Sequence, residues 1–222
     1  ALTRGAVQSD SERRSAAQTR NDARKIDIGT EFDAAYIIRP CQGEFLSGDD
    51  VYVARQDDRL FIALIDALGH GACANAAARR AKDAFRNHSN SSVVELIGIL
   101  HDALSSTVGA AVSICEINAS NHSGQYVGVG NTVGRILGKR DIRLHSIAGV
   151  VGDNLRSARP DRFNLGLEDV LVFYSDGISD RFGIDDYPQL RYQSSKAIVS
   201  NTLERFGKHH DDASCLALRR LA

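Results

Sequence analysis

The sequence predicts an α+β fold in which helices pack against antiparallel sheets, and three observations lead to this class. Segments with strand-like and helix-like patterns do not alternate one for one, as they would in a doubly wound parallel sheet. Several strand-like segments follow one another without an intervening helix, and consecutive strands of this kind pair antiparallel. Finally, 222 residues of which 43% are hydrophobic are enough to bury one sizeable core.

The first part of the predicted domain contains strands. Residues 1–28 are polar and charge-mixed, so we interpret them as an N-terminal extension or linker and place a single domain at 29–222. Short apolar runs bounded by turn residues then predict strands at 34–39, 51–55 and 60–65.

Two helices follow, and the chain then returns to strands. Residues 69–87 are rich in Ala, and 92–105 carries apolar residues at helical spacing. Alternating or continuous apolar patterns predict five strands, at 110–117, 124–129, 133–137, 142–145 and 170–174. A last helix is predicted at 194–206 and a last strand at 213–219.

Composition excludes several classes of protein. The 27 Lys and Arg residues are balanced by 28 Asp and Glu, whereas a nucleic-acid-binding protein normally carries a basic excess. The longest purely apolar run, residues 60–65, is far shorter than the roughly 20 residues of a membrane-spanning helix. The 4 cysteines are far apart and lack CxxC spacing, which is typical of reduced thiols in a cytoplasmic protein.

The acidic residues are strongly skewed, with 21 Asp and only 7 Glu. Four Asp-bearing segments lie where predicted strands meet turns: SGDD at 47–50, IDALGHG at 65–71, YSDG at 174–177 and DDAS at 211–214. A carboxylate at the end of a strand is held on a rigid scaffold and still reaches a ligand. Converging carboxylates repel one another unless cations bridge them, and sites made of oxygen ligands suit Mg²⁺ or Mn²⁺.

Each of these segments alone has a simpler interpretation, because Asp-Gly pairs are common in turns. Four segments in similar contexts favour a shared site, and only their position in space can show whether they meet.

Six motifs in this order resemble the SpoIIE-like branch of the PPM-type, metal-dependent serine/threonine phosphatases. They cover roughly residues 34–220 and are SGDD, IDALGHG before an Ala-rich helix, GAAVSI at 109–114, YVGVGN at 126–131, YSDG and DDAS. The short chain without sensor domains is most similar to the RsbX-like, stand-alone phosphatases of bacterial stressosomes. The resemblance implies an antiparallel β-sandwich flanked by helices.

The resemblance also implies a site for two divalent cations, Mn²⁺ or Mg²⁺. Asp66 would bridge both ions, and the backbone carbonyl of Ala67 would be a further ligand. Asp176 and Asp211 would complete one metal site, and Asp49 would serve the other, directly or through water.

Several neighbouring residues have less certain roles in this picture. Asp50 and Asp212 are the fallback ligands next to the assigned ones. His70 could protonate the leaving seryl oxygen as a general acid, whereas a structural hydrogen bond is the simpler role for a turn residue. Ala67 replaces the usual Gly of the family, which a backbone ligand tolerates, and Val108 stands where a basic or polar residue is common.

The implied reaction is hydrolysis of phosphoserine or phosphothreonine by a metal-activated water, without a phosphoenzyme. The implied substrate is a phosphorylated regulatory protein with a STAS domain. Two alternatives stay open: a catalytically weak phosphoprotein-binding module of the same fold, and a metal-dependent phosphodiesterase. Four basic residues could receive a phosphorylated partner or be solvated charges at sheet edges, namely Arg135, Lys139, Arg140 and Arg143.

Overall fold

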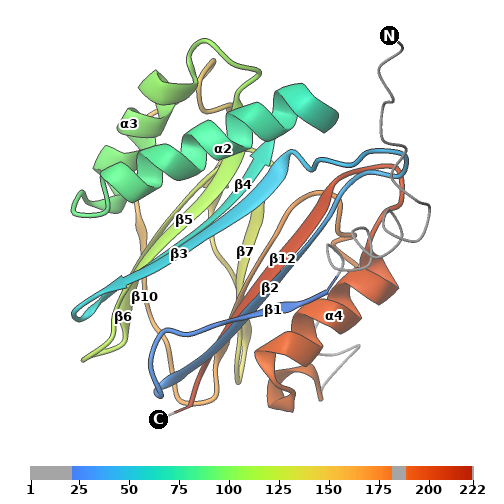
Figure 1. Ribbon diagram of the computed structural model, residues 1–222. Helices are drawn as coiled ribbons and strands as arrows, with labels where there is room; N and C mark the ends of the chain where they lie inside the picture. Colours follow the sequence, from blue (N-terminus) through green and yellow to red (C-terminus); the bar gives the residue numbers. More distant parts are fainter. Residues whose placement is uncertain (1–21, 182–188, 222) are drawn as a thin grey trace, which may run out of the picture.

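Two sheets pack face to face in the computed structural model, which describes residues 22–181 and 189–221 (Figure 1). The first sheet has the order β1 (Arg24–Ile26), β2 (Phe32–Arg39), β12 (Ala213–Arg220), β11 (Val170–Tyr174), β7 (Val133–Leu137) and β8 (Asp141–Arg143). The second has the order β10 (Asp161–Asn164), β6 (Ser123–Val129), β5 (Ala110–Asn118), β4 (Arg59–Ala67) and β3 (Asp49–Gln56). All these pairs are antiparallel, and the two-residue β9 (Ser146–Ile147) joins β6 in parallel. The predicted α+β sandwich is confirmed.

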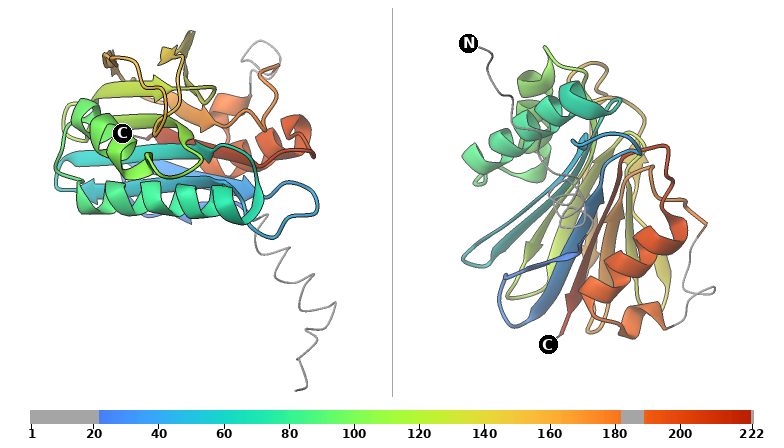
Figure 2. Two further views of the ribbon diagram at one scale, coloured as in Figure 1. Left: turned by 90° about the horizontal axis from the view of Figure 1, so that it is seen from above. Right: turned by 45° about the vertical axis from the view of Figure 1, so that its right-hand side comes forward.

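Helices cover the outer faces of both sheets (Figure 2). The second sheet carries α2 (Gly71–Asn87) and α3 (Val93–Leu104), and the first carries α4 (Ser195–Phe206), which follows the short 3₁₀-helix η1 (Leu190–Tyr192). A capping box begins α3, because Ser92 and Glu95 satisfy each other's backbone NH groups. The layers are therefore helix, sheet, sheet, helix.

Strand β4 contributes to two separate cores. Leu60, Ile62 and Leu64 pack between the two sheets, and the alternate residues Phe61 and Ile65 pack beneath α2 and α3. Residues at alternate positions point to opposite faces of a strand, so the continuous apolar run at 60–65 reflects burial on both faces. Asp66 follows this run directly, which fixes its backbone on a rigid element.

The sequence does not predict β1, β9 or β10. Ile26 of β1 pairs with Ala34 of β2, and Ala23 and Ile28 are buried. The sheet therefore begins at Arg24, within the segment 1–28 that we interpret as an extension or linker, and residues 1–21 lie outside the described ranges. These strands have only two to four residues and lie beside polar turns, so no clear periodic pattern marks them.

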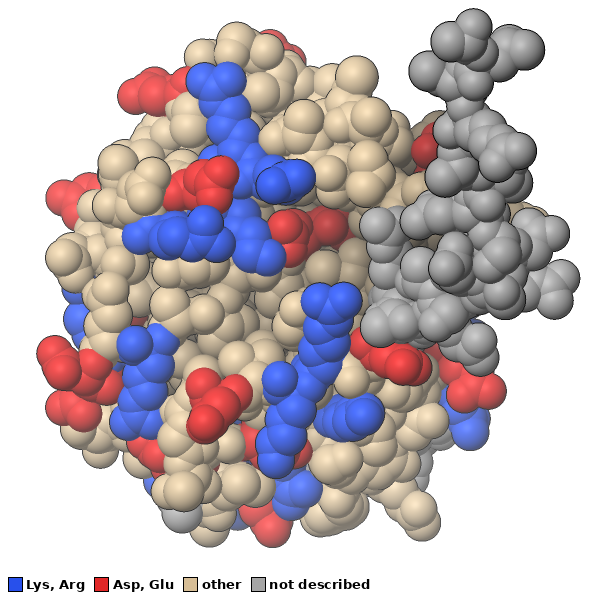
Figure 3. All heavy atoms as spheres, viewed as in Figure 1, with Lys and Arg blue, Asp and Glu red and all other residues tan. Residues whose placement is uncertain are grey.

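Charges of both signs are mixed on the molecular face shown in Figure 3. No helix of the described residues is long and apolar enough to cross a membrane. All 4 cysteines are free, and Cys41, Cys115 and Cys215 are buried. The thiol state agrees with the interpretation of the cysteines as unpaired.

Candidate metal centre

Four segments that are far apart in the sequence meet at one end of the sandwich, the upper end in Figure 1. There β4 ends at Ala67 and β3 begins at Asp49, while β11 ends at Tyr174 next to the start of β12. Asp49 and Asp66 lie opposite each other in the antiparallel register. The carboxylates of Asp176 and Asp211 come from the first sheet, so both sheets contribute to the site.

Ser175 ties the two sheets together at this end. Its hydroxyl donates a hydrogen bond of 2.6 Å to Oδ2 of Asp49, and it accepts one of 3.0 Å from the backbone NH of Ser214. The backbone NH of Ser175 donates to the carbonyl of Ser214 at 3.1 Å. Ser175 and Ser214 are fully buried, so these bonds hold Asp49 in one orientation without competition from water.

Asp49 and Asp66 are buried carboxylates with unusual pKa values. Burial raises the pKa of Asp49 to about 7, against the opposing effect of the hydrogen bond from Ser175. Burial and, to a smaller extent, the charges of Asp49, Asp176 and Asp211 together raise the pKa of Asp66 to about 9. The other three predicted ligands therefore all lie close enough to Asp66 to raise its pKa.

Asp176 is held from two sides. Asn131 donates a hydrogen bond of 2.7 Å from Nδ2 to Oδ2 of Asp176, and Lys208 donates one of 2.6 Å from Nζ to its backbone carbonyl. Burial and the charge of Asp211 raise the pKa of Asp176, while the positive charge of Lys208 lowers it. Oδ1 of Asp211 accepts a hydrogen bond from the backbone NH of Asp212 at 3.0 Å.

The fallback residue Asp212 has a structural position. Its Oδ1 accepts a hydrogen bond from the backbone NH of Cys41, and its Oδ2 accepts one from the NH of Gly48, both at 2.7 Å. Because both oxygens are engaged in backbone bonds, Asp212 fastens the loop before β3 to the start of β12.

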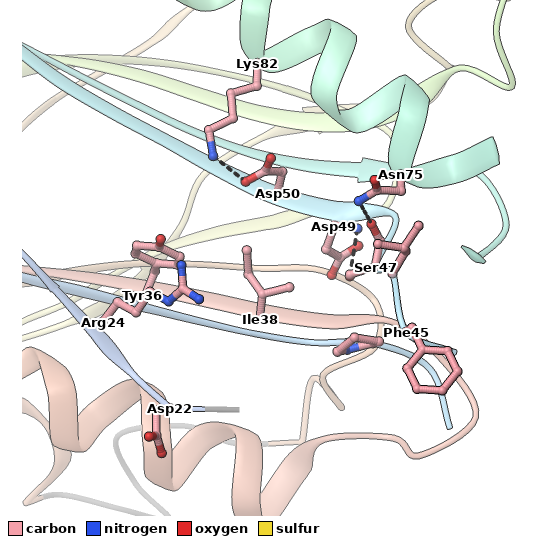
Figure 4. A pocket seen from close by; sticks show the side chains of 12 residues that line it. Asp22, Arg24, Tyr36, Ile38, Phe45, Ser47, Asp49, Asp50, Asn75 and Lys82 are labelled. Atoms are coloured by element: carbon pink, nitrogen blue, oxygen red, sulfur yellow. Dashed lines mark hydrogen bonds and ion pairs between the residues drawn. The ribbon is translucent and has the colours of Figure 1, made fainter. Parts of the chain in front are cut away.

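The fallback residue Asp50 is also engaged elsewhere. Its Oδ1 accepts a hydrogen bond of 2.7 Å from Nζ of Lys82 on α2 (Figure 4). The same oxygen accepts one of 2.8 Å from the NH of Val51. As the neighbour of Asp49 on a strand, Asp50 points to the opposite face. The geometry therefore favours Asp49 over Asp50 and Asp211 over Asp212 as ligands.

Ala67 and His70 lie at the turn that follows β4. The NH of Ala67 donates to the carbonyl of Gly48 at 3.1 Å, which fixes the backbone beside Asp66. His70 precedes the first residue of α2, and its exposed ring places Nδ1 3.0 Å from Oε1 of Glu44. This contact gives His70 a structural partner, and its role as a general acid stays a prediction.

The carboxylates form an open set of ligands. Oδ1 of Asp49 and Oδ2 of Asp66 are buried, and neither has a hydrogen-bond partner among the described residues. Within those same ranges, no group of three or more His, Cys, Asp or Glu side chains is placed so that it could by itself hold a metal ion. Mg²⁺ usually keeps several waters and takes only one or two carboxylates directly, so an open set with partnerless buried oxygens fits hard divalent cations.

Sequence reasoning did not identify Ser175, Asn131 and Lys208 as parts of the site. Ser175 and Asn131 lie within the YSDG and YVGVGN motifs, so their position was visible and only their contacts were not. Two of the four basic residues singled out from the sequence form ion pairs, Arg135 with Asp141 and Arg143 with Asp180. Arg143 lies exposed on the edge strand β8, which agrees with an interpretation as a charge at a sheet edge, whereas Arg135 is buried on β7 between β11 and β8.

Comparison with known proteins identifies the family to which this chain belongs. Residues 56–221 match the family described as stage II sporulation protein E, SpoIIE. The chain belongs to the SpoIIE family. A SpoIIE-family relative, the phosphoserine phosphatase RsbX of Bacillus subtilis strain 168, is 31% identical over 90 residues. That alignment covers 40% of this chain and 45% of the relative, so it spans less than half of that protein.

Solved structures share the fold of this chain. A chain from a study of the bacterial stressosome, described as a modular system adapted to control secondary messenger signaling, has a TM-score of 0.80 and 24% identity. It is matched over 86% of this chain and 100% of that one. RsbX in complex with magnesium has a TM-score of 0.78 and 19% identity, over 89% of this chain and 99% of that one. These similarities establish the fold.

Proposed function

We propose that this protein is a metal-dependent protein serine/threonine phosphatase, a phosphoric monoester hydrolase. The observation that carries the proposal is the meeting of Asp49, Asp66, Asp176 and Asp211 at one end of a SpoIIE-family sandwich. Membership of a fold family alone does not define an activity, because function resides in the site. The four carboxylates are residues of the type that this chemistry uses as metal ligands, which supports the proposal.

The carboxylates of these four residues, with the carbonyl of Ala67, would hold two divalent cations, Mn²⁺ or Mg²⁺. Such ions, when bound, lower the pKa of water and offset the negative charge of a phosphoryl group. The buried, partnerless oxygens of Asp49 and Asp66 support this assignment, since a buried carboxylate without a partner is costly unless a cation or a proton compensates it. RsbX, a relative of this chain, was solved with magnesium.

The surrounding residues would orient these ligands. Ser175 fixes the rotamer of Asp49, and Asn131 fixes that of Asp176. Asp212 holds the loop before β3 against β12, which keeps the two sheets in register at the site. Preorganisation of this kind reduces the reorganisation needed during the reaction.

The proposed substrate is a phosphorylated regulatory protein of the cytoplasm, of the STAS-domain type. The similarity to RsbX and to a stressosome structure supports a partner in a regulatory assembly. The four-carboxylate site makes an enzyme a better hypothesis than a binding module, because a module that only docks a phosphoprotein does not need these ligands.

Hydrolysis of p-nitrophenyl phosphate tests the proposal. We expect activity that requires Mn²⁺ or Mg²⁺, is lost in Asp66→Asn and persists in Asp58→Asn, a matched change at the exposed turn between β3 and β4. Activity that is absent, or indifferent to metal and to Asp66→Asn, would overturn the mechanism and favour the binding module. Faster cleavage of a cyclic dinucleotide than of a phosphoserine peptide would favour the phosphodiesterase.

A further inference from the structure

Four large apolar side chains are exposed around the metal centre. Phe45 is 68% exposed and Leu46 is 38% exposed in the loop before β3. Leu68 is 44% exposed after β4, and Val108 is 42% exposed before β5. We call these four residues the apolar rim. Single exposed apolar residues need no explanation, whereas a group of them beside a site marks a surface for a ligand or a partner.

Backbone and side-chain contacts join the three loops that carry the apolar rim. The loop before β3 is joined to the turn after β4 by the contact between Glu44 and His70 and by the bond from the NH of Ala67 to Gly48. The NH of Leu68 donates to the carbonyl of Gly109 at 3.1 Å, which joins that turn to the segment of Val108. The rim therefore belongs to one connected surface.

A cavity of about 200 Å³ connects part of this surface, at Phe45 and Leu46, with Asp49. Phe45 and Leu46 line it together with Ile38 and Pro40, and Asp49 forms part of the same wall (Figure 4). A side chain that entered the cavity would lie beside Asp49, so apolar contacts and the carboxylate site are within reach of one ligand.

Two pairs of charged groups lie beside the apolar rim, and Asp22 and Arg24 also line the cavity. Glu44 contacts His70, and Asp50 forms an ion pair with Lys82 at 2.7 Å. Paired charges attract a charged ligand less than free ones, so these two pairs contribute little to recognition and the exposed apolar side chains offer a separate means of it. Val108 adds to this character at a position where the sequence resemblance leads us to expect a polar group.

We propose that the apolar rim is the docking surface for a phosphoprotein whose phosphoserine is flanked by large apolar side chains. This inference rests on the proposed function, because a phosphate can reach Asp49 and Asp66 only if the protein that carries it lies over the adjoining loops. Burial of Phe45 and Leu68 against apolar partner residues provides binding energy, and aromatic residues commonly dominate such interfaces.

Two synthetic phosphoserine peptides of equal length and charge test the docking surface. In one, Leu, Val and Phe flank the phosphoserine, and in the other Ser, Gly and Asn take their places. We expect wild-type protein with Mn²⁺ to prefer the apolar peptide at least about tenfold in kcat/KM. In Phe45→Ser/Leu68→Ser we expect the ratio of the two kcat/KM values to fall to about twofold or less. Each value is normalised to the rate at which the same variant hydrolyses p-nitrophenyl phosphate.

The control variant is Leu167→Ser. Leu167 is 60% exposed and precedes β11 at the end of the strand far from Tyr174, so it should leave the preference unchanged. Equal kcat/KM for both peptides in wild type, or an unchanged preference in the double variant, would overturn the proposed docking surface. The proposed function would still stand if the protein hydrolysed p-nitrophenyl phosphate in a Mn²⁺-dependent way. Absence of all metal-dependent hydrolysis would overturn both proposals. A preference retained in Phe45→Ser/Leu68→Ser but lost in Val108→Ser would also contradict docking on the rim as a whole.

Discussion

Asp49 and Asp66 lie opposite each other across the β3–β4 pair, and each has a buried carboxylate oxygen without a hydrogen-bond partner in the described part of the chain. Directly opposed residues of an antiparallel pair have Cβ atoms only about 5 Å apart. Two ionised carboxylates in this position repel each other, and the charges of Asp176 and Asp211 add to the repulsion. Charge repulsion at the site therefore lowers the stability of the metal-free protein when these carboxylates are ionised, with measurable consequences.

The first prediction concerns stability and pH. The raised pKa values of Asp49 and Asp66 mean that the folded state holds protons that the unfolded state releases near pH 4. Their contribution to stability is complete below that pH and is lost as the pH rises toward 7 and 9. In EDTA, we expect the melting temperature of wild type to fall between pH 5 and pH 9, and Asp66→Asn to melt at least a few degrees higher than wild type at pH 8.5. An Asp66→Asn protein that melts lower than wild type at pH 8.5 would contradict this.

The second prediction concerns metal binding and protons. A cation must displace the protons that Asp66 and Asp49 retain near neutral pH, so the affinity for Mn²⁺ should rise with pH and binding should release protons. Between pH 6.5 and pH 8.5 we expect roughly a tenfold or greater gain in affinity. Titration calorimetry in two buffers with different ionisation enthalpies measures the release. Equal affinities at both pH values, with no released proton, would refute the prediction.

The third prediction separates the adjacent residues Asp211 and Asp212. Asp212→Ala removes two buried acceptors of backbone NH groups and should reduce the free energy of unfolding by about 3 kcal/mol. Asp211→Ala should reduce the affinity for Mn²⁺ and change the stability of the metal-free protein much less. Urea denaturation in EDTA and a Mn²⁺ titration of each variant measure the two effects. If the variants exchanged these effects, Asp212 would be the metal ligand, and Asp211 would be the residue that joins the loop before β3 to β12.

The fourth prediction concerns Ser175, which positions Asp49. Ser175→Ala removes the hydroxyl that donates to Asp49 and should raise the pKa of Asp49 further, so that Mn²⁺ binds about tenfold more weakly at pH 7. Ser195→Ala is the matched control, because Ser195 is equally buried and donates its hydroxyl bond to the carbonyl of Asp33 instead. Both variants should lose stability, and only Ser175→Ala should lose affinity. Equal loss of affinity in the two variants would indicate a general effect on folding.

The long elements were predictable because a strong periodic signal marks them. The buried run of β4 and the helical spacing of Leu96 and Leu100 in α3 follow directly from burial on one or both faces. The strand β1 was not predictable, because its three residues pair with β2 through backbone atoms, and its two basic side chains carry no apolar pattern.

The candidate site was predictable in its residue types and not in its contacts. The sequence indicated Asp at four strand ends, yet Asp211 and Asp212 are chemically identical in a sequence. The family resemblance ranks Asp211 before Asp212, and the NH groups of Cys41 and Gly48, more than 160 residues earlier, supply the physical reason by engaging both oxygens of Asp212. Long-range hydrogen bonds of this kind depend on the packing of the two sheets and leave no local pattern.

The two hydrogen bonds by which Asp212 joins the loop before β3 to β12 have an evolutionary consequence. A chain that lost catalysis would no longer need Asp211, while it would still need Asp212 to join the loop before β3 to β12. Mutational drift should therefore erase the two neighbouring aspartates at different rates. In any inactive descendant of this protein that keeps the sandwich, we expect Asp212 to outlast Asp211.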